Sequence, residues 1–388
     1  QILFPANTHF TFDLFQQFKT SKKDDNIFCS PLSISSALAM TYLGAKENTA
    51  FEMEMVGALH FNEVTENTEG RTTRDHLGNV HHQFQKLLTE LKKPTDANEL
   101  NIANKLYGEK NYQFLQEYMD NVKKFYLTSV ESVDFKNAPE ESRKKINSWV
   151  ESQTHEKIKD LLPKNSLEFT TVLVLVNAIY FKGQWDNKFD KRNTVEKEFW
   201  LNKDTSKPVQ MMKQVNVFKF TSLEDIKAKI LEIPYKGKDL SMVLLLPDDV
   251  DGLQKLEDQL TAEKLREWTS SQNMHDNYVD LYLPRFKVEE TYDLKDTLRA
   301  LGMVDVFNPQ RANLSGMTGT KDLLVSKVIH KSFVEVTEEG TEAASSTAVV
   351  VNVGSPPTHP FHCDHPFLFF IRHNKTNSIL FLGRVSSP

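Results

Sequence analysis

The sequence is poor in cysteine and has no long apolar run. Its 388 residues include only Cys29 and Cys363, too few for a scaffold stapled by several disulfides. Two cysteines fit a reducing compartment, or at most one bridge. No apolar run reaches the roughly 18–20 residues of a membrane-spanning helix, and the first residues lack the basic and apolar segments of a secretion signal. We therefore expect no membrane partner and no classical export signal.

The sequence also lacks an excess of basic residues. Lys and Arg number 47 against 53 Asp and Glu, which gives a net charge of −6. Nucleic-acid-binding domains usually carry a basic surplus, so we expect no nucleic-acid partner. Hydrophobic residues make up 39% of the chain and 26 residues are Phe. A chain of this length and composition can bury a large core, which excludes intrinsic disorder.

Motifs of common enzymes and cofactor sites are missing. The sequence contains no G-x-S-x-G, G-x-G-x-x-G, G-x4-G-K-[ST], H-E-x-x-H or C-x-x-C. We therefore predict that the protein is not an enzyme and binds no cofactor. His359, His362, Cys363 and His365 lie close enough in sequence to suggest a metal site. Neighbouring residues of an extended segment point to opposite faces, so a structural role is favoured over a metal site.

Helical patterns come first in the chain and strand patterns later. Ser30-Pro31 predicts a helix start, because Ser caps well and Pro suits the first helical position, and Gly44 can end this helix. A second helix is expected from Pro139 to Leu161. The almost wholly apolar run Val172–Phe181 predicts a strand covered on both faces at the centre of a large sheet. This order predicts an α+β fold.

Further strands are expected near the end of the sequence. Residues 227–235 and 240–247 predict one hairpin, and residues 367–371 and 379–382 predict another. Residues 278–290 alternate between apolar and polar side chains, which indicates a strand with one buried face.

One polar stretch, residues 62–78, predicts a surface loop. His81 and His82 follow it directly. We expect these two residues at an exposed helix start rather than in a ligand pair.

The most informative segment runs from Val334 to Phe361. Between Gly340 and Pro360 it has no bulky residue except His359. From Thr341 to Val353 one alternate set of residues is small or β-branched. The other set begins with the charge of Glu342 and is small or polar apart from Val350. Such a segment is either simply a strand or a loop that can become a strand.

Several blocks of the sequence resemble the serpin family. EEGTEAASST resembles the serpin hinge, and FLFFIRHNKTNSILFLGRVSSP resembles the serpin C-terminal signature. Further matching blocks are Asn26–Thr49, Val174–Trp185 and Leu324–Phe333. The lack of a signal, the polar loop and the SSP terminus are similar to the intracellular, ovalbumin-type branch (clade B). Within it, EESRKKINSWVESQT and EVTEEGTEAA resemble the squamous cell carcinoma antigens.

The resemblance implies a serpin fold, in which helices pack on three β-sheets and a reactive-centre loop is exposed. It implies one domain over residues 1–388, with a polar surface loop at 62–78 and the hinge and reactive-centre loop at 338–360. It further implies a cytoplasmic monomer, and leaves open a release that needs no classical signal.

The function implied by the resemblance is suicide inhibition of a protease. The protease attacks the loop as a substrate, and the cut loop then inserts into the main sheet with the protease attached. The alternative is a non-inhibitory serpin that serves as a binding or storage protein. Small residues in the hinge favour the inhibitor. The hinge comprises Glu338, Glu339, Gly340, Thr341, Glu342, Ala343, Ala344, Ser345, Ser346 and Thr347.

Counting along the hinge predicts the reactive bond. In the family pattern the primary-specificity residue lies sixteen positions after the hinge glutamate, so Glu338 points to Gly354 and to the bond Gly354–Ser355. Glycine offers no side chain to a primary pocket, whereas papain-like proteases read mainly the preceding residue, here Val353. This favours a cathepsin-type cysteine protease as the partner. A cut one residue earlier would favour an elastase-like enzyme, and elastase- or chymotrypsin-like serine proteases remain the second class of partner.

The resemblance also assigns structural positions around the main sheet. The polar shutter under the sheet opening comprises Ser30, Ser33, Asn177 and His330. Trp185 matches the breach, where insertion starts, and Arg285 is expected beside it, paired with Glu338.

Overall fold

The structure is a computed structural model, and it describes residues 3–45, 50–61, 73–341 and 357–388. The described helices are α1 (Leu3–Ser21), α2 (Pro31–Leu43), α3 (Ala50–Ala58), α5 (Thr73–Leu91), α6 (Gln116–Tyr126), α7 (Pro139–Gln153), α8 (Leu253–Gln259), α9 (Ala262–Trp268), α10 (Lys295–Ala300) and α11 (Ser315–Thr318), with short 3₁₀ turns η1 (Lys191–Asn193) and η2 (Asp305–Phe307). The described strands are β1 (Ile27–Cys29), β2 (Asn98–Glu109), β3 (Val130–Val133), β4 (Leu173–Gly183), β5 (Val195–Trp200), β6 (Ser206–Leu223), β7 (Ala228–Pro234), β8 (Leu240–Pro247), β9 (His275–Pro284), β10 (Phe286–Asp293), β11 (Lys327–Val336), β12 (His359–His362), β13 (Phe367–His373) and β14 (Ser378–Val385).

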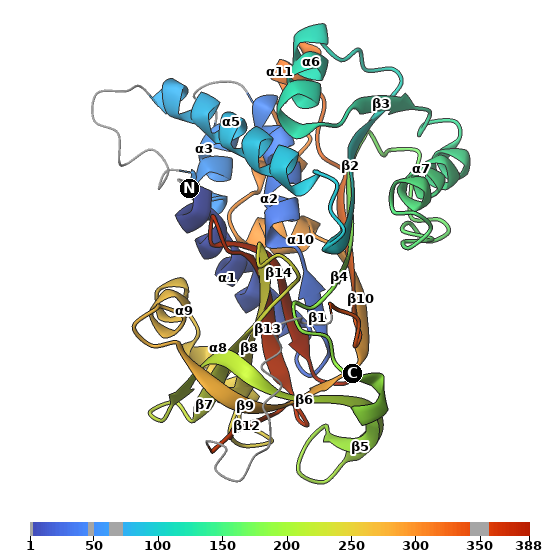
Figure 1. The fold of residues 1–388 in the computed structure, drawn as a ribbon. Helices are drawn as coiled ribbons and strands as arrows, with labels where there is room; N and C mark the ends of the chain where they lie inside the picture. Colours follow the sequence, from blue (N-terminus) through green and yellow to red (C-terminus); the bar gives the residue numbers. More distant parts are fainter. Residues whose placement is uncertain (1–2, 46–49, 62–72, 342–356) are drawn as a thin grey trace.

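Hydrogen bonds join the described strands into two sheets (Figure 1). One has five strands in the order β10-β11-β4-β2-β3. The other has nine, in the order β1-β14-β13-β8-β7-β6-β9-β12, with β5 paired to β6. The described strands therefore form two sheets where three were expected, because two of the expected sheets are joined into the nine-stranded one. The long strand β6 joins them, because it pairs with β5 at one end, with β7 at the other and with β9 between.

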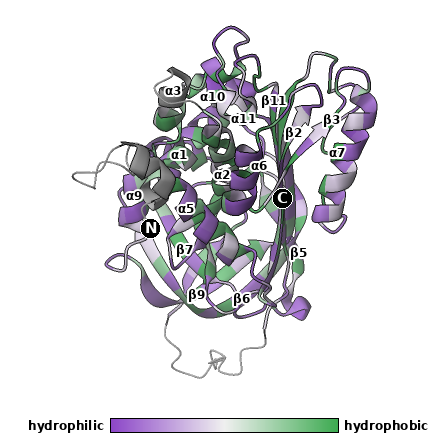
Figure 2. Cartoon of the chain, turned by 90° about the horizontal axis from the view of Figure 1, so that it is seen from above, coloured by the Kyte–Doolittle hydropathy of each residue, from purple (hydrophilic) through white to green (hydrophobic). Residues whose placement is uncertain are grey.

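The predicted central strand is β4, which is buried along nearly its whole length. Leu175 and Ile179 belong to the large core that also contains residues of α1 and α2. Val174 and Val176 point the other way, into a smaller core that includes residues of α7. Seen from above, α7 lies on one side of the five-stranded sheet and α1, α2 and α6 lie on the other (Figure 2). Cover on both faces explains why this strand has no apolar–polar alternation.

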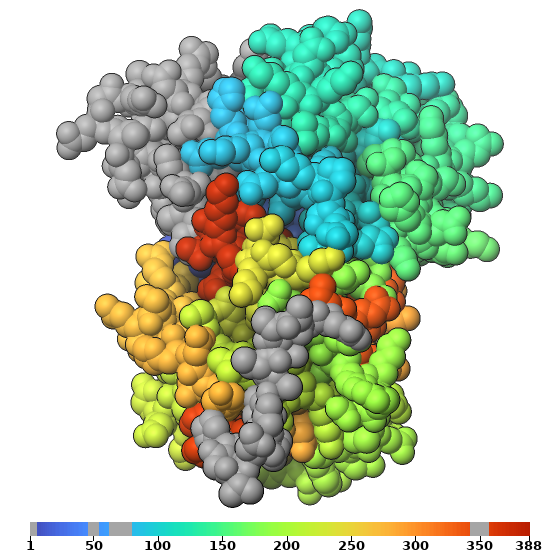
Figure 3. All heavy atoms as spheres, viewed as in Figure 1, coloured from blue at the N-terminus to red at the C-terminus, as the bar shows by residue number. Residues whose placement is uncertain are grey.

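Helix α2 confirms the predicted start at Ser30-Pro31. The Ser30 side chain accepts a hydrogen bond from the Ser33 N–H, and Gly44 caps the other end. Nearly every residue of α2 is buried, and little of the blue N-terminal segment reaches the surface shown in Figure 3. Helix α7 is shorter than expected. It ends at Gln153 because His155 and Glu156 adopt positive φ angles of 49° and 65°, which no right-handed helix accommodates.

Both predicted hairpins are present, as β7–β8 and β13–β14. The alternating segment 278–290 is not one strand. It is divided at Arg285 between β9 of the nine-stranded sheet and β10 of the five-stranded sheet. Both cysteines are buried free thiols, and burial raises the pKa of each. In the described ranges, no helix is both long enough and apolar enough to cross a membrane.

The expected exposed helix start at His81 is wrong. His81 lies inside α5 and is buried, and its Nδ1 is 2.5 Å from the Tyr126 hydroxyl. Burial, together with the neighbouring His82, lowers the pKa of His81 to about 3, so this ring is neutral. Residues 73–78 of the predicted polar loop belong to α5, and residues 62–72 lie outside the described ranges.

Candidate functional site

The described part of the hinge is hydrogen-bonded to the chain that follows β4, where Gly340 and Trp185 form an isolated parallel bridge. The Trp185 N–H donates to the Glu339 carbonyl at 3.0 Å, and the Thr341 N–H donates to the Trp185 carbonyl at 3.0 Å. On either side, the Phe189 N–H donates to Glu338 and the Lys188 N–H donates to Thr341. Hinge residues 338–341 therefore follow β11 directly and are held next to the chain that leaves β4. The hinge from Glu342 to Thr347, the subsite Val353 and the bond Gly354–Ser355 lie outside the described residues.

Glu338 forms the predicted ion pair with Arg285. Its two carboxylate oxygens accept from Arg285 Nε at 3.0 Å and Nη2 at 2.5 Å, and its side chain is 2% exposed. The Thr194 hydroxyl donates a third bond at 2.8 Å. Burial alone would raise the pKa of this carboxyl, but the bonds from Arg285 and Thr194 outweigh it and lower the pKa. The charged pair therefore locks the start of the hinge to the end of β9.

Trp185 closes the same end of the sheet. Its indole Nε1–H donates to the Thr337 carbonyl at 2.8 Å, and its ring stacks on Tyr235 at 4.5 Å. Gly340 packs against the Trp185 backbone so closely that a Cβ at residue 340 would lie 2.6 Å from the Trp185 carbonyl oxygen. The glycine is therefore required by close approach. The sequence resemblance placed Trp185 here, but gave no signal for Tyr235 or Thr194.

The four predicted shutter residues form one buried network. Asn177 Nδ2 donates to Ser33 Oγ at 2.6 Å, and Asn177 Oδ1 lies 2.6 Å from His330 Nδ1. The Ser30 N–H donates to His330 Nε2 at 3.0 Å, and the Ser30 hydroxyl donates to the Leu380 carbonyl. Because Nε2 accepts, the ring proton is on Nδ1 and points at Asn177. The network therefore ties α2 to β4, β11 and β14.

The network lies directly at the junction between β4 and β11. These two strands are parallel neighbours, with Lys327 opposite Val174 at one end and Glu335 opposite Lys182 at the other. His330 and Asn177 are register partners in the middle of this junction. Any strand entering between β4 and β11 would have to separate this pair.

His330 makes the stability of the protein sensitive to acid. Burial lowers its pKa to about 3, whereas a free histidine titrates near 6.5. Below pH ~6.5 this histidine is protonated in the unfolded chain but stays neutral in the folded chain. The free energy of unfolding therefore falls as the pH decreases, and His330 contributes up to ~1.4 kcal/mol per pH unit to this fall. We expect His330→Asn to reduce this pH slope by about that amount between pH 6 and 4.5, measured by urea unfolding. An unchanged slope in the variant would mean that His330 titrates normally in the folded chain.

The histidines suspected as metal ligands have other partners. His362 Nε2 lies 3.1 Å from Asp280, and its ring stacks on Tyr282 at 3.8 Å. His365 Nε2 lies 2.6 Å from the Pro247 carbonyl. Within the described ranges, no group of three or more His, Cys, Asp or Glu side chains is placed to hold a metal ion.

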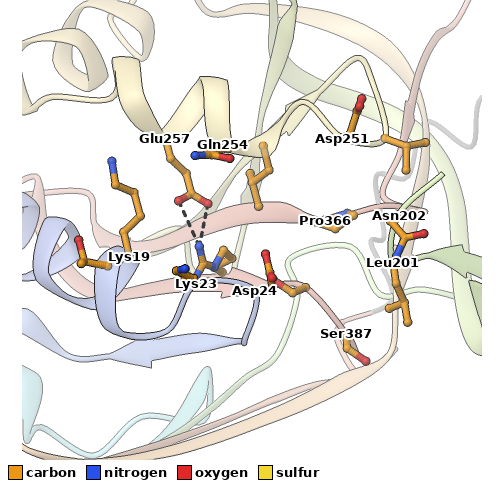
Figure 4. A pocket seen from close by; sticks show the side chains of 15 residues that line it. Lys19, Lys23, Asp24, Leu201, Asn202, Asp251, Gln254, Glu257, Pro366 and Ser387 are labelled. Carbon is orange, nitrogen blue, oxygen red and sulfur yellow. Dashed lines mark hydrogen bonds and ion pairs between the residues drawn. The ribbon is translucent and has the colours of Figure 1, made fainter. Parts of the chain in front are cut away.

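A cavity of about 860 Å³ lies away from the hinge, beside the end of α1 and helix α8. Figure 4 shows Glu257 pointing at its ion-pair partner inside this cavity. That partner is Arg384, whose Nη1 lies 3.1 and 3.2 Å from the two carboxylate oxygens, and both side chains are almost fully buried. Arg384 also donates to the carbonyls of Lys22 and Asp25. These bonds anchor the last strand to α8 and to the end of α1, which is a structural role.

The chain belongs to the serpin family. The family model described as Serpin (serine protease inhibitor) matches residues 5–388. Serpin B3 of Homo sapiens, one of the squamous cell carcinoma antigens, is 68% identical over 389 residues, covering 99% of this chain and 98% of that protein. Leukocyte elastase inhibitor of Equus caballus is 50% identical over 388 residues, with the same coverage. The structure of uncleaved ovalbumin matches with a TM-score of 0.91 at 40% identity, covering 99% of both chains.

These similarities confirm the predicted serpin fold and the resemblance to the ovalbumin-type branch and the squamous cell carcinoma antigens. Family membership and the inhibitor relatives support protease inhibition, with a protease as partner, rather than catalysis.

Proposed function

We propose that the protein is a suicide inhibitor that is cleaved in its reactive-centre loop, inserts the hinge between β4 and β11, and so traps the attacking protease. The observation that carries this proposal is the pairing of Glu338–Thr341 with residues 185–189. These backbone hydrogen bonds and the parallel bridge between Gly340 and Trp185 hold the start of the hinge at the end of the junction into which it would insert.

Insertion is favoured because it adds a strand to the middle of a sheet. Without it, β4 and β11 share one parallel ladder of hydrogen bonds. An inserted strand would replace that ladder with two, and would bury its small and β-branched side chains on one face. At ~3.3 Å per residue, about 14 inserted residues would carry the attached protease roughly 45 Å.

In this proposal the breach and the shutter control the opening of the sheet between β4 and β11. Trp185, with the pair Arg285–Glu338, holds the hinge at the entrance. Ser30, Ser33, Asn177 and His330 hold the middle of the junction closed. Both are hydrogen-bonded arrangements with defined partners, and each must rearrange for a full-length strand to enter.

We propose a papain-like cysteine protease of the cathepsin type as the target, because Gly354 offers no primary side chain and Val353 suits the subsite that these enzymes read. The similarity to leukocyte elastase inhibitor supports an elastase-like serine protease as the second target.

The test is to incubate the protein with a papain-like cathepsin and, separately, with elastase- and chymotrypsin-like proteases. We expect loss of cathepsin activity, with release of a C-terminal peptide that starts at Ser355 by mass spectrometry. Activity is the primary readout, since a thioester-linked complex does not reliably survive denaturing gels. Release of the same peptide with full protease activity would contradict the proposal and favour a non-inhibitory binding protein.

A further inference from the structure

Two valines are exposed side by side on β6, a strand of the nine-stranded sheet. Val215 is 42% exposed and Val217 is 36% exposed. They alternate with Asn216 and Phe218, which turn toward the other face, where Phe218 is buried. The pattern leaves one face of β6 open, with Lys213 and Lys219 on either side of the two valines.

The neighbouring strands extend this face. β9 contributes the register partners Tyr278 and Asp280, opposite Val217 and Val215. β12 follows on the far side of β9, where Pro360 pairs with Asp280. We call this surface the open sheet face. It consists of Lys213, Val215, Val217, Lys219, Tyr278, Asp280, Tyr282, Pro360 and His362.

The charges on the open sheet face are unbalanced. Its carboxylate Asp280 contacts His362, and Lys219 lies 3.7 Å from Asp276. Lys213, together with Lys197 of β5, instead rests against the Tyr282 ring, with the two ammonium nitrogens 4.7 and 4.3 Å from its centroid. Among the described residues neither of these two lysines forms an ion pair. The face therefore presents an apolar centre with a basic edge, and fits a partner with an apolar patch beside acidic side chains.

The open sheet face is also close to the predicted reactive bond. β12 is the first strand after the loop, and its first residue, His359, pairs with Val279, the β9 residue between the partners of the two valines. Two strand spacings of ~4.8 Å place the valines about 10 Å across the sheet from His359. The bond Gly354–Ser355 is only a few residues before His359 in the chain, a span of at most ~15 Å. Figure 1 shows β6, β9 and β12 together at one end of the molecule.

We propose that the open sheet face is a second contact surface for the target protease, used while the protease holds the loop. This inference rests on the proposed inhibitory function. A protease domain of about 220 residues has a radius of gyration of ~17 Å and therefore spans at least ~34 Å. The bond lies at most about 25 Å from the valines, counting ~10 Å across the sheet and ~15 Å along the chain. A protease that holds the bond is therefore large enough to contact this face. Contact here speeds the first encounter and leaves the later choice between trapping and hydrolysis unchanged.

The test is the double variant Val215→Asp/Val217→Asp. We expect its second-order rate constant for cathepsin inhibition to fall about tenfold, with an unchanged number of inhibitor molecules consumed per protease, an unchanged cleavage site and an unchanged melting temperature. Val304→Asp is the matched control, because Val304 is 45% exposed and lies between α10 and η2. It should inhibit at the wild-type rate.

Lys213→Gln is the second variant, since it adds no charge to the sheet. We expect slower inhibition and a shallower dependence of the rate constant on salt, because an electrostatic contact is screened by ions. If wild type inhibits, and the double-valine variant and Lys213→Gln inhibit at the wild-type rate, the open sheet face is not a contact surface and the inhibitory function stands. If wild type inhibits none of the proteases, the proposed function fails first.

Discussion

Thr341→Arg is expected to turn the protein from an inhibitor into a substrate. The protease will still cut the loop, but it will leave active, and the number of inhibitor molecules consumed per protease inactivated will rise at least about tenfold. Thr341 is the first residue of the alternate set that would face the interior after insertion. Burying an arginine there costs several kcal/mol, and each 1.4 kcal/mol added to the insertion barrier slows that step tenfold relative to hydrolysis.

The geometry around Thr341 supports this choice of residue. Its N–H already donates to the Trp185 carbonyl, and its hydroxyl donates to the Asp186 carbonyl. Hydrogen bonds therefore already fix Thr341 at the entrance to the junction between β4 and β11. Glu342→Arg is the matched control, because residue 342 belongs to the other alternate set, which already begins with a charge. That variant should inhibit with wild-type stoichiometry.

Titration of a fixed amount of protease with each variant measures the stoichiometry, and a melting curve confirms that each is folded. A Thr341→Arg protein that inhibits as efficiently as wild type would show that the hinge alignment is wrong. Loss of inhibition in Glu342→Arg as well would show that any charge in the hinge is harmful, so that the alternation is not the cause.

Asn177→Ala is expected to destabilise the closed sheet by about 2–6 kcal/mol. The variant removes the bonds to Ser33 and His330, and each buried group left without a partner costs ~1–3 kcal/mol. Because these bonds close the junction between β4 and β11, we expect easier opening on heating and growth of polymers by strand exchange between molecules. Size-exclusion chromatography after graded heating measures this.

Asn104→Ala is the matched control for Asn177→Ala. Asn104 is the register partner of Asn177 on β2, and it is also buried. However, its Nδ2 has only a 3.8 Å contact with the Met40 sulfur, and its Oδ1 has no hydrogen-bond partner among the described residues. We expect a smaller loss of stability and no polymers. If Asn177→Ala remains monomeric on heating as wild type does, the shutter assignment is wrong.

Much of this architecture is predictable because it depends on local patterns. The apolar run at 172–181 predicted a buried central strand, since a strand covered on both faces has no polar side to show. Ser30-Pro31 predicted the start of α2, because capping and proline geometry involve only neighbouring residues. The resemblance to serpins grouped Asn177 and His330 in one polar cluster and placed Trp185 by motif, without giving the individual hydrogen bonds.

Other features depend on contacts between distant segments and have no local signal. His81 looks like a polar residue near a loop, but tertiary packing against Tyr126 buries it. Residues 278–290 alternate without a break, yet Arg285 separates two sheets, because β9 and β10 find different neighbours.

The sequence by itself determined the capped helix α2 and the family, because each follows from neighbouring residues or from blocks of continuous sequence. Only the tertiary structure decided that Thr194 joins Arg285 in binding Glu338, that His330 is neutral, and that two valines of β6 lie beside the base of the loop. These properties depend on burial and on distances between atoms that are far apart in the chain. Neither quantity can be derived from neighbouring residues.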